Sequence, residues 1–141
     1  MGKIRTLRGQ CNHDEVKHLI IDDGNFNHAF KVLEFKVLSI DPRTGNQDAW
    51  GTLATNENGA SLWDLSDSRQ IGWAGQTIAS SDSPEPTMAL IDPDHIVVRD
   101  LYVYGQDAVG QGFQYFIRLE SVLIDDDNAI IALIKESSQD V

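Results

Sequence analysis

A cysteine and two histidines lie close together near the N-terminus, and these residue types bind metals and act in nucleophilic catalysis. Cys11 is followed by His13 and then by His18. A structural zinc site needs four ligands, and the chain contains no Cys-x-x-Cys or His-x-x-x-His pair. Only His28 or His95 remains to complete such a set. We therefore predict no metal site and no cofactor, and interpret these side chains as polar groups of loops and strand edges.

The chain shows no pattern that predicts catalysis. A nucleophilic Cys11 needs a base, an orienting group and an oxyanion hole, and its neighbours in RGQCNHD match no nucleophile motif. The acidic clusters at residues 22–23, 92–94 and 125–128 lack the spacing of a calcium loop, and Asp and Asn are the usual residues of turns. The glycines of residues 105–112 are not followed by a phosphate-binding Lys-Ser/Thr, so we expect a hairpin loop there. We predict that the protein is not an enzyme.

Aromatic residues are the stronger candidates for binding. Tryptophan and tyrosine are the anchors most enriched at protein interfaces and also serve sugar sites. We therefore take Trp50, Trp63 and Trp73 as interaction residues, although some of the aromatic side chains must fill the core. Their neighbours are neutral or acidic, which disfavours a platform for nucleic-acid bases.

Charge restricts the possible partners. The chain has 22 acidic and 11 basic residues and a net charge of −11, which repels nucleic acid and anionic membranes. Lys3, Arg5 and Arg8 nevertheless form a short basic run at the N-terminus. We predict that residues 1–16 form a basic arm and that residues 17–141 form one domain. Contact with nucleic acid is expected at most through that arm. No apolar stretch is long enough to span a bilayer, so we expect no membrane contact.

Frequent turns separate segments that have the residue pattern of β-strands. Residues 29–40 alternate around Leu33, Phe35 and Val37, while Phe30 and Val32 have the opposite parity, which predicts a bulge near Val32. Residues 113–124 alternate cleanly, and residues 95–104 carry apolar groups on both faces, which predicts a central strand. Further strands are expected at residues 18–21, 49–54, 70–80, 87–91 and 129–135, whereas residues 62–68 are ambiguous.

These seven or eight short strands predict one all-β domain, an antiparallel β-sandwich. No longer segment keeps helical periodicity, which argues against an α/β fold. We favour a single jelly roll, but the residues alone do not fix the strand order, and an immunoglobulin-like order remains open.

Several blocks of the chain resemble short acidic proteins predicted in marine phage genomes. The blocks are residues 8–15 (RGQCNHDE), 69–74 (RQIGWA), 92–103 (DPDHIVVRDLYV) and 134–140 (IKESSQD). The resemblance implies a virion structural protein, a small jelly-roll capsid or capsid-associated subunit. It provides no catalytic residues to transfer to this chain.

We therefore expect an assembly protein of a bacteriophage virion, with copies of itself and other virion proteins as partners and the virion as its location. Small β-sandwiches build shells through edges, loops and terminal arms, and we expect the basic arm to join neighbouring acidic subunits head to tail. The alternative is a carbohydrate- or receptor-binding module that uses exposed tryptophan and tyrosine. A third possibility is a cupin-like metal enzyme with ligands among His13, His18, His28 and His95.

Overall fold

The structure, a computed structural model of the chain, describes residues 3–22, 24, 27–40, 48–77, 88–92 and 94–124. Within these residues the chain forms nine strands and one 3₁₀ turn, against the seven or eight strands expected. The strands are β1 (Ile4–Cys11), β2 (Glu15–Ile20), β3 (His28–Ser39), β4 (Ala49–Ala54), β5 (Gln70–Gln76), β6 (Met88–Ile91), β7 (Ile96–Val97), β8 (Asp100–Asp107) and β9 (Phe113–Leu123), and the 3₁₀ turn η1 covers Glu57–Gly59.

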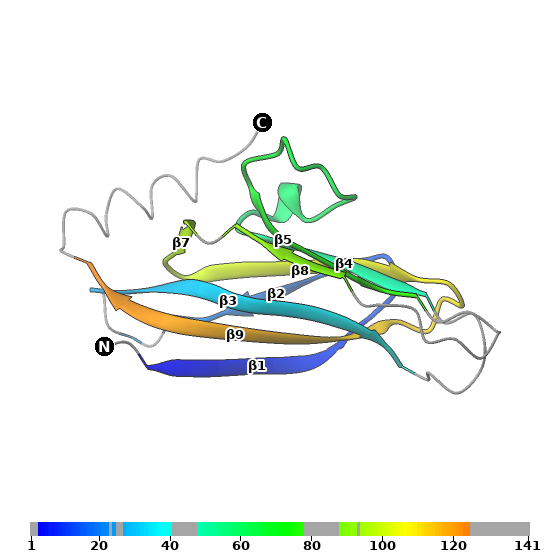
Figure 1. Ribbon diagram of the computed structural model, residues 1–141, viewed down its shortest axis with the longest axis horizontal. Helices are drawn as coiled ribbons and strands as arrows, with labels where there is room; N and C mark the ends of the chain where they lie inside the picture. Colours follow the sequence, from blue (N-terminus) through cyan, green and yellow to red (C-terminus); the bar gives the residue numbers. More distant parts are fainter. Residues whose placement is uncertain are drawn as a thin grey trace.

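The strands form two antiparallel sheets that pack as the layers of a sandwich (Figure 1). The four-stranded sheet has the order β1-β9-β3-β7, and the five-stranded sheet has the order β2-β8-β4-β5-β6. The pairs β1·β9, β2·β8, β3·β7 and β4·β5 are nested in sequence, which is the winding of a jelly roll, and β6 extends the second sheet. The predicted all-β sandwich is confirmed.

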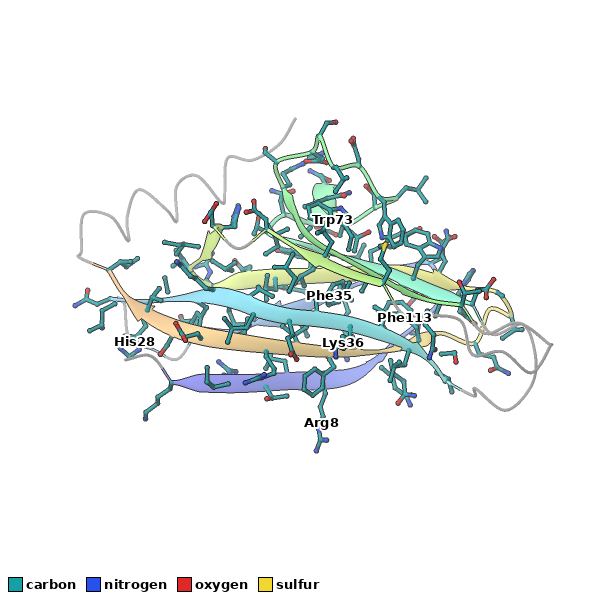
Figure 2. All side chains as sticks on the ribbon, viewed as in Figure 1. Arg8, His28, Phe35, Lys36, Trp73 and Phe113 are labelled. Carbon is teal, nitrogen blue, oxygen red and sulfur yellow. The ribbon has the colours of Figure 1, made fainter. Side chains whose placement is uncertain are left out.

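The core lies between the sheets and is built from the inward side chains of alternating strands. In β9 the predicted inner face of Phe113, Tyr115, Ile117 and Leu119 is buried, as the period-two pattern requires. The five-stranded sheet faces them with its own apolar residues, and Figure 2 shows Phe35 and Phe113 between the layers. The largest of these side chains in the opposing sheet are Leu53, Ile71, Leu101 and Val103.

The bulge predicted in the long strand β3 is present. The register against β9 shifts between Val32 and Glu34. Leu33 is the extra residue and is 40% exposed, so its predicted place on the inner face with Phe35 is wrong. The bulge changes the parity of the strand, which is why Val32 and Phe35 both reach the core.

The single strand predicted at residues 95–104 is two strands in different sheets. β7 ends at Val97 in the four-stranded sheet, and β8 begins at Asp100 in the other. The chain crosses between the sheets at Val98, which is buried, and this crossing explains the apolar residues of both parities. β8 lies between β2 and β4, so the central position predicted for this segment holds for its second half.

The N-terminal segment is not an arm. Residues of β1 pair with β9 from Ile4↔Glu120 to Cys11↔Phe113, and Cys11 is buried in the core. The expected boundary between residues 16 and 17 falls inside β2. The physical reason is that β9 needs a second neighbour for its backbone groups, and β1 provides it. Sequence patterning misses this strand because Leu7 is the one large apolar side chain on its inner face, where Arg5 and Gly9 interrupt the apolar pattern.

The remaining expectations have mixed outcomes. Strands are found near their predicted positions at β2, β4, β5 and β6, although β2 begins at Glu15, before the predicted segment 18–21, and β5 ends at Gln76. Residues 62–68 are irregular and not helical. The loop after β8 is not a hairpin loop, because it joins β8 to β9 in the opposite sheet. The predicted strand at 129–135 and the acidic turn at 125–128 lie outside the described residues.

The close approach of β4, β8 and β9 predicts that Gly105 tolerates no side chain. A Cβ there would lie 2.3 Å from the Trp50 carbonyl oxygen and 2.7 Å from the Phe113 ring. Gly105→Ala should lower the free energy of unfolding by about 2 kcal/mol, as overpacking does. The matched control is Gly75→Ala, where a Cβ has ordinary contacts from 3.4 Å and should cost nothing. Urea denaturation measures both, and equal stabilities of the two variants would contradict this packing.

Candidate interaction surfaces

The three tryptophans predicted as interaction residues differ in exposure. Trp73, on β5, is only 7% exposed, and its indole N–H donates to Gln70 Oε1 at 2.8 Å (Figure 2). It lies on the outer face of the five-stranded sheet, but the loop of residues 55–69 covers it. Its predicted role as a surface anchor is therefore wrong. Trp63 is 43% exposed and Trp50 is half-buried, so these two remain available.

Trp63, Trp50 and Tyr104 form an aromatic row on the outer face of the five-stranded sheet. The Trp50 and Trp63 rings are edge-on at 5.7 Å between centroids, and Trp50 meets Tyr104 in the same way at 5.9 Å. The Trp63 indole N–H donates to the Gly51 carbonyl oxygen at 2.9 Å. These contacts fix the rings in place, so the row is organised before any partner binds.

A groove of about 530 Å³ runs beside this row, and we call it the tryptophan groove. Trp50, Trp63, Met88 and the carboxylate of Asp48 line it. Gly75 forms part of its floor, where the missing side chain leaves room between the two indole rings. The groove is therefore mostly apolar, with a carboxylate at its margin.

Exposed apolar side chains gather on the same side of the molecule. β2 contributes Val16 and Ile20, β6 contributes Met88 and Leu90, and the 55–69 loop contributes Leu62, Trp63 and Leu65. Ile20 is 66% exposed and Leu65 is 69% exposed. Leu62, Trp63 and Met88 line the tryptophan groove together, whereas Val16 and Ile20 lie on the opposite edge strand. Clustered apolar surface marks interaction sites more often than isolated exposed residues do.

The outer face of the four-stranded sheet has a different character. Arg8, Phe116 and Lys36 lie in one row across β1, β9 and β3, so an aromatic ring is placed between two cations. Arg8 points away from the sandwich in Figure 2. A groove of about 440 Å³ lies here, lined in part by Arg8, Leu38 and Phe116, and we call it the basic groove. Arg118 Nη1 lies 3.6 Å from Glu34 Oε1 on the next row.

The other two basic residues of the N-terminal run lie apart from this groove. Arg5 Nη1 donates to the Ile21 carbonyl oxygen at 2.7 Å, and the Lys3 backbone N–H donates to Ser121 Oγ at 3.0 Å. Both line a separate cavity of about 900 Å³ near the end of β9. The fold therefore divides Lys3, Arg5 and Arg8 between two places, because Arg5 and Arg8 have opposite parity on β1 and Lys3 precedes the strand.

The possible metal ligands near the N-terminus are not brought together. Cys11 faces the core, and burial is the main cause that raises the pKa of its thiol, which makes it a poor nucleophile. His18 lies on the outer face of β2, stacks on Tyr102 at 4.5 Å, and has its Nε2 2.7 Å from Asp100 Oδ1. Among the described residues no group of three or more His, Cys, Asp or Glu side chains is placed to hold a metal ion.

His13 belongs instead to a polar network that sequence reasoning missed. The Asp107 carboxylate is buried and accepts hydrogen bonds from the backbone N–H groups of Gln111 and Gly112, both at 2.9 Å. His13 Nδ1 lies 3.0 Å from Asp107 Oδ1 and 3.0 Å from the Asp107 backbone nitrogen. It donates to the carboxylate when Nδ1 carries a proton and accepts from the backbone N–H when it does not. Asp14, in the same turn, accepts from the Tyr104 hydroxyl. The network binds the β1–β2 turn to the β8–β9 loop.

The pKa of Asp107 follows from these contacts. Burial of the carboxyl alone would raise its pKa, but the hydrogen bonds from Gly112, Gln111 and His13 outweigh burial and hold it below the ordinary value. The role of the network is therefore structural: it holds the β1–β2 turn and the β8–β9 loop together at one end of the sandwich. The sequence signal was Asp107 followed by Gly110 and Gly112, both of which have positive φ.

Comparison of the chain with protein-family models and with curated proteins finds no match. Among the described residues no helix is long and apolar enough to cross a lipid bilayer. The functional argument therefore depends on the two outer faces of the sandwich.

The Asp107 network predicts a pH-dependent contribution to stability. Asp107→Asn places an N–H₂ group against one of two backbone N–H donors and should cost about 1–3 kcal/mol at pH 7. Because the carboxyl has a lowered pKa in the folded state, its contribution is complete above the unfolded pKa of about 3.9 and is lost as the pH falls through the folded value. The difference between the two proteins should therefore shrink in acid.

Urea denaturation between neutral and acidic pH measures this difference. Asp94→Asn, at an exposed carboxyl, is the control and should leave stability nearly unchanged. A difference between wild type and Asp107→Asn that stays constant from pH 7 to about pH 3 would contradict the assignment.

Proposed function

We propose that this chain is a structural subunit of a bacteriophage virion, a capsid or capsid-associated protein that assembles through contacts between its copies. The resemblance of several sequence blocks to small acidic phage proteins supports this proposal. The jelly roll also supports it, since capsid subunits commonly have this fold, although the same fold serves lectins and cupins. The fold alone therefore does not separate the candidate functions.

The observation that carries the proposal is the apolar outer side of the five-stranded sheet. Ile20, Leu62, Leu65 and Leu90 are each at least half exposed there. Each square ångström of such surface that is removed from water contributes about 25 cal/mol to the free energy of association. A complex in which a partner covers this side would therefore be stabilised. Aliphatic side chains favour a protein partner over a sugar, because sugars need polar groups around the aromatic ring.

The edges of the sandwich favour contacts through its faces. β7 has two residues and β6 has four, so two of the sheet edges offer little backbone for pairing with another chain. The other two edge strands, β1 and β2, are longer, but charged side chains such as Arg8 on β1 and Lys17 on β2 discourage edge-to-edge addition. In this proposal the partners are copies of the chain and other virion proteins, and the location is the virion. Any contact with nucleic acid falls to the cations of β1.

The proposal predicts that the full chain self-associates. Sedimentation velocity at increasing concentration should give species heavier than the 15.7 kDa monomer, and negative-stain microscopy should show assemblies of regular shape. Burial of the apolar side is the physical reason. A strictly monomeric protein at the highest concentration reached, with no particles on the grid, would overturn the proposal.

The tryptophan groove favours a second candidate, a carbohydrate- or receptor-binding module. Trp50 and Trp63 present fixed aromatic surface beside the Asp48 carboxylate, and a sugar ring uses both kinds of group. The groove is open and free of large side chains at Gly75.

Glycan binding tests this candidate directly. Saturable binding on a glycan array that is lost in Trp63→Ala would establish a sugar site, since that change removes one wall of the groove. Gly75→Val, which fills the floor between the indole rings, should abolish the same binding while both tryptophans remain. Absence of binding to any glycan by the wild-type protein would remove this candidate.

A further inference from the structure

We propose that copies of this chain join head to tail, with the tip of the 55–69 loop of one copy seated in the basic groove of the next. This inference rests on the proposed self-association and names the two surfaces that meet. The tip, residues 62–65, is called the 62–65 knob. It has the sequence Leu-Trp-Asp-Leu, which is apolar and acidic.

The knob is held in a fixed conformation by its own loop. The Gln70 amide nitrogen donates to the carbonyl oxygens of Gly59 and Leu62, at 3.0 and 2.8 Å, and Gln70 Oε1 accepts from the Asp64 N–H at 2.9 Å. Gln70 is buried, so these bonds are shielded from water. Leu62 and Leu65 nevertheless remain exposed. A rigid loop that presents apolar side chains loses little conformational entropy when it binds.

The basic groove has the complementary chemistry. Phe116 and the exposed Leu38 offer apolar surface, and Arg8 and Lys36 stand on either side of Phe116. Leucine side chains of the knob match the apolar surface, and the Asp64 carboxylate matches the cations. On a chain of net charge −11, this is a local concentration of positive charge.

The two surfaces lie on opposite sides of the sandwich. Figure 1 shows the loop between β4 and β5 on one side, and β1 with β9 on the other. A contact between two different patches is heterologous. When two copies join, one keeps a free groove and the other keeps a free knob. Further copies can therefore add until the assembly closes into a ring or continues as an open chain. This is the type of contact that a particle subunit needs.

A nucleic-acid strand is the rival occupant of the basic groove. It is disfavoured because a strand lays several phosphates across the face and would meet Glu34 and Glu120 beside the cations, whereas the knob brings a single carboxylate. The apolar Leu38 also has no role in holding a phosphate backbone.

The test uses charge exchange between two full-length variants. Leu65→Lys places a cation on the knob, and Lys36→Glu places an anion beside Phe116 at the margin of the groove. Each variant alone should therefore self-associate at least about tenfold more weakly than wild type. Mixing them restores both kinds of contact, because the altered knob meets the altered groove and the native knob meets the native groove. Sedimentation velocity of the mixture should show association close to that of wild type.

Leu123→Lys is the matched control, because it makes the same change at a side chain that is 78% exposed and outside both surfaces. It should associate as wild type does, and circular dichroism should show all variants folded. Unchanged association of Leu65→Lys, or a mixture that stays monomeric, would overturn the head-to-tail contact while self-association of the wild type still stands. A wild type that never associates refutes the proposed function itself. Single-stranded oligonucleotide binding that is lost in Lys36→Glu, with association unchanged, would assign the groove to nucleic acid and overturn the proposal.

Discussion

The central position of β9 is the constraint on which the rest of the structure depends. The strand pairs with β1 on one side and β3 on the other, although the paired residues are between 74 (Ser39↔Phe113) and 116 (Ile4↔Glu120) positions apart in the chain. Its inner side chains, including Phe113 and Ile117, fill the core. Its outward-facing residues include Phe116, which lies between a cation of each neighbouring strand. One alternating segment therefore fixes both the packing of the sandwich and the composition of an outer face.

The alternation of inward and outward side chains also explains why the two outer faces differ. Each sheet must turn apolar groups inward, so its outward positions are free to carry other chemistry. The four-stranded sheet uses them for charged residues around Phe116, whereas the five-stranded sheet keeps aromatic and aliphatic groups there. The loop of residues 55–69 covers Trp73 and at the same time exposes Leu65. Two unlike faces on one small domain are the basis of the proposed head-to-tail assembly.

Sequence patterning predicted the sandwich and most of its strands, because alternation and turn residues are local signals. It missed β1, whose inner positions include Gly9 and a cation, and it joined β7 to β8 across a buried crossing at Val98. It also took Trp73 as a surface residue, since exposure depends on a covering loop that local patterns do not reveal. The basic groove was beyond prediction for a related reason: Arg8, Lys36 and Phe116 meet only through long-range register.

Hydroxyl-radical footprinting of the assembled and the dissociated protein tests the central claim most directly, because it measures the solvent exposure of individual side chains. The account predicts that Leu65 on the knob and Phe116 in the basic groove lose reactivity together on assembly, while the exposed Leu123 keeps its reactivity. Assemblies in which Leu65 and Phe116 remain as reactive as in the monomer would contradict it.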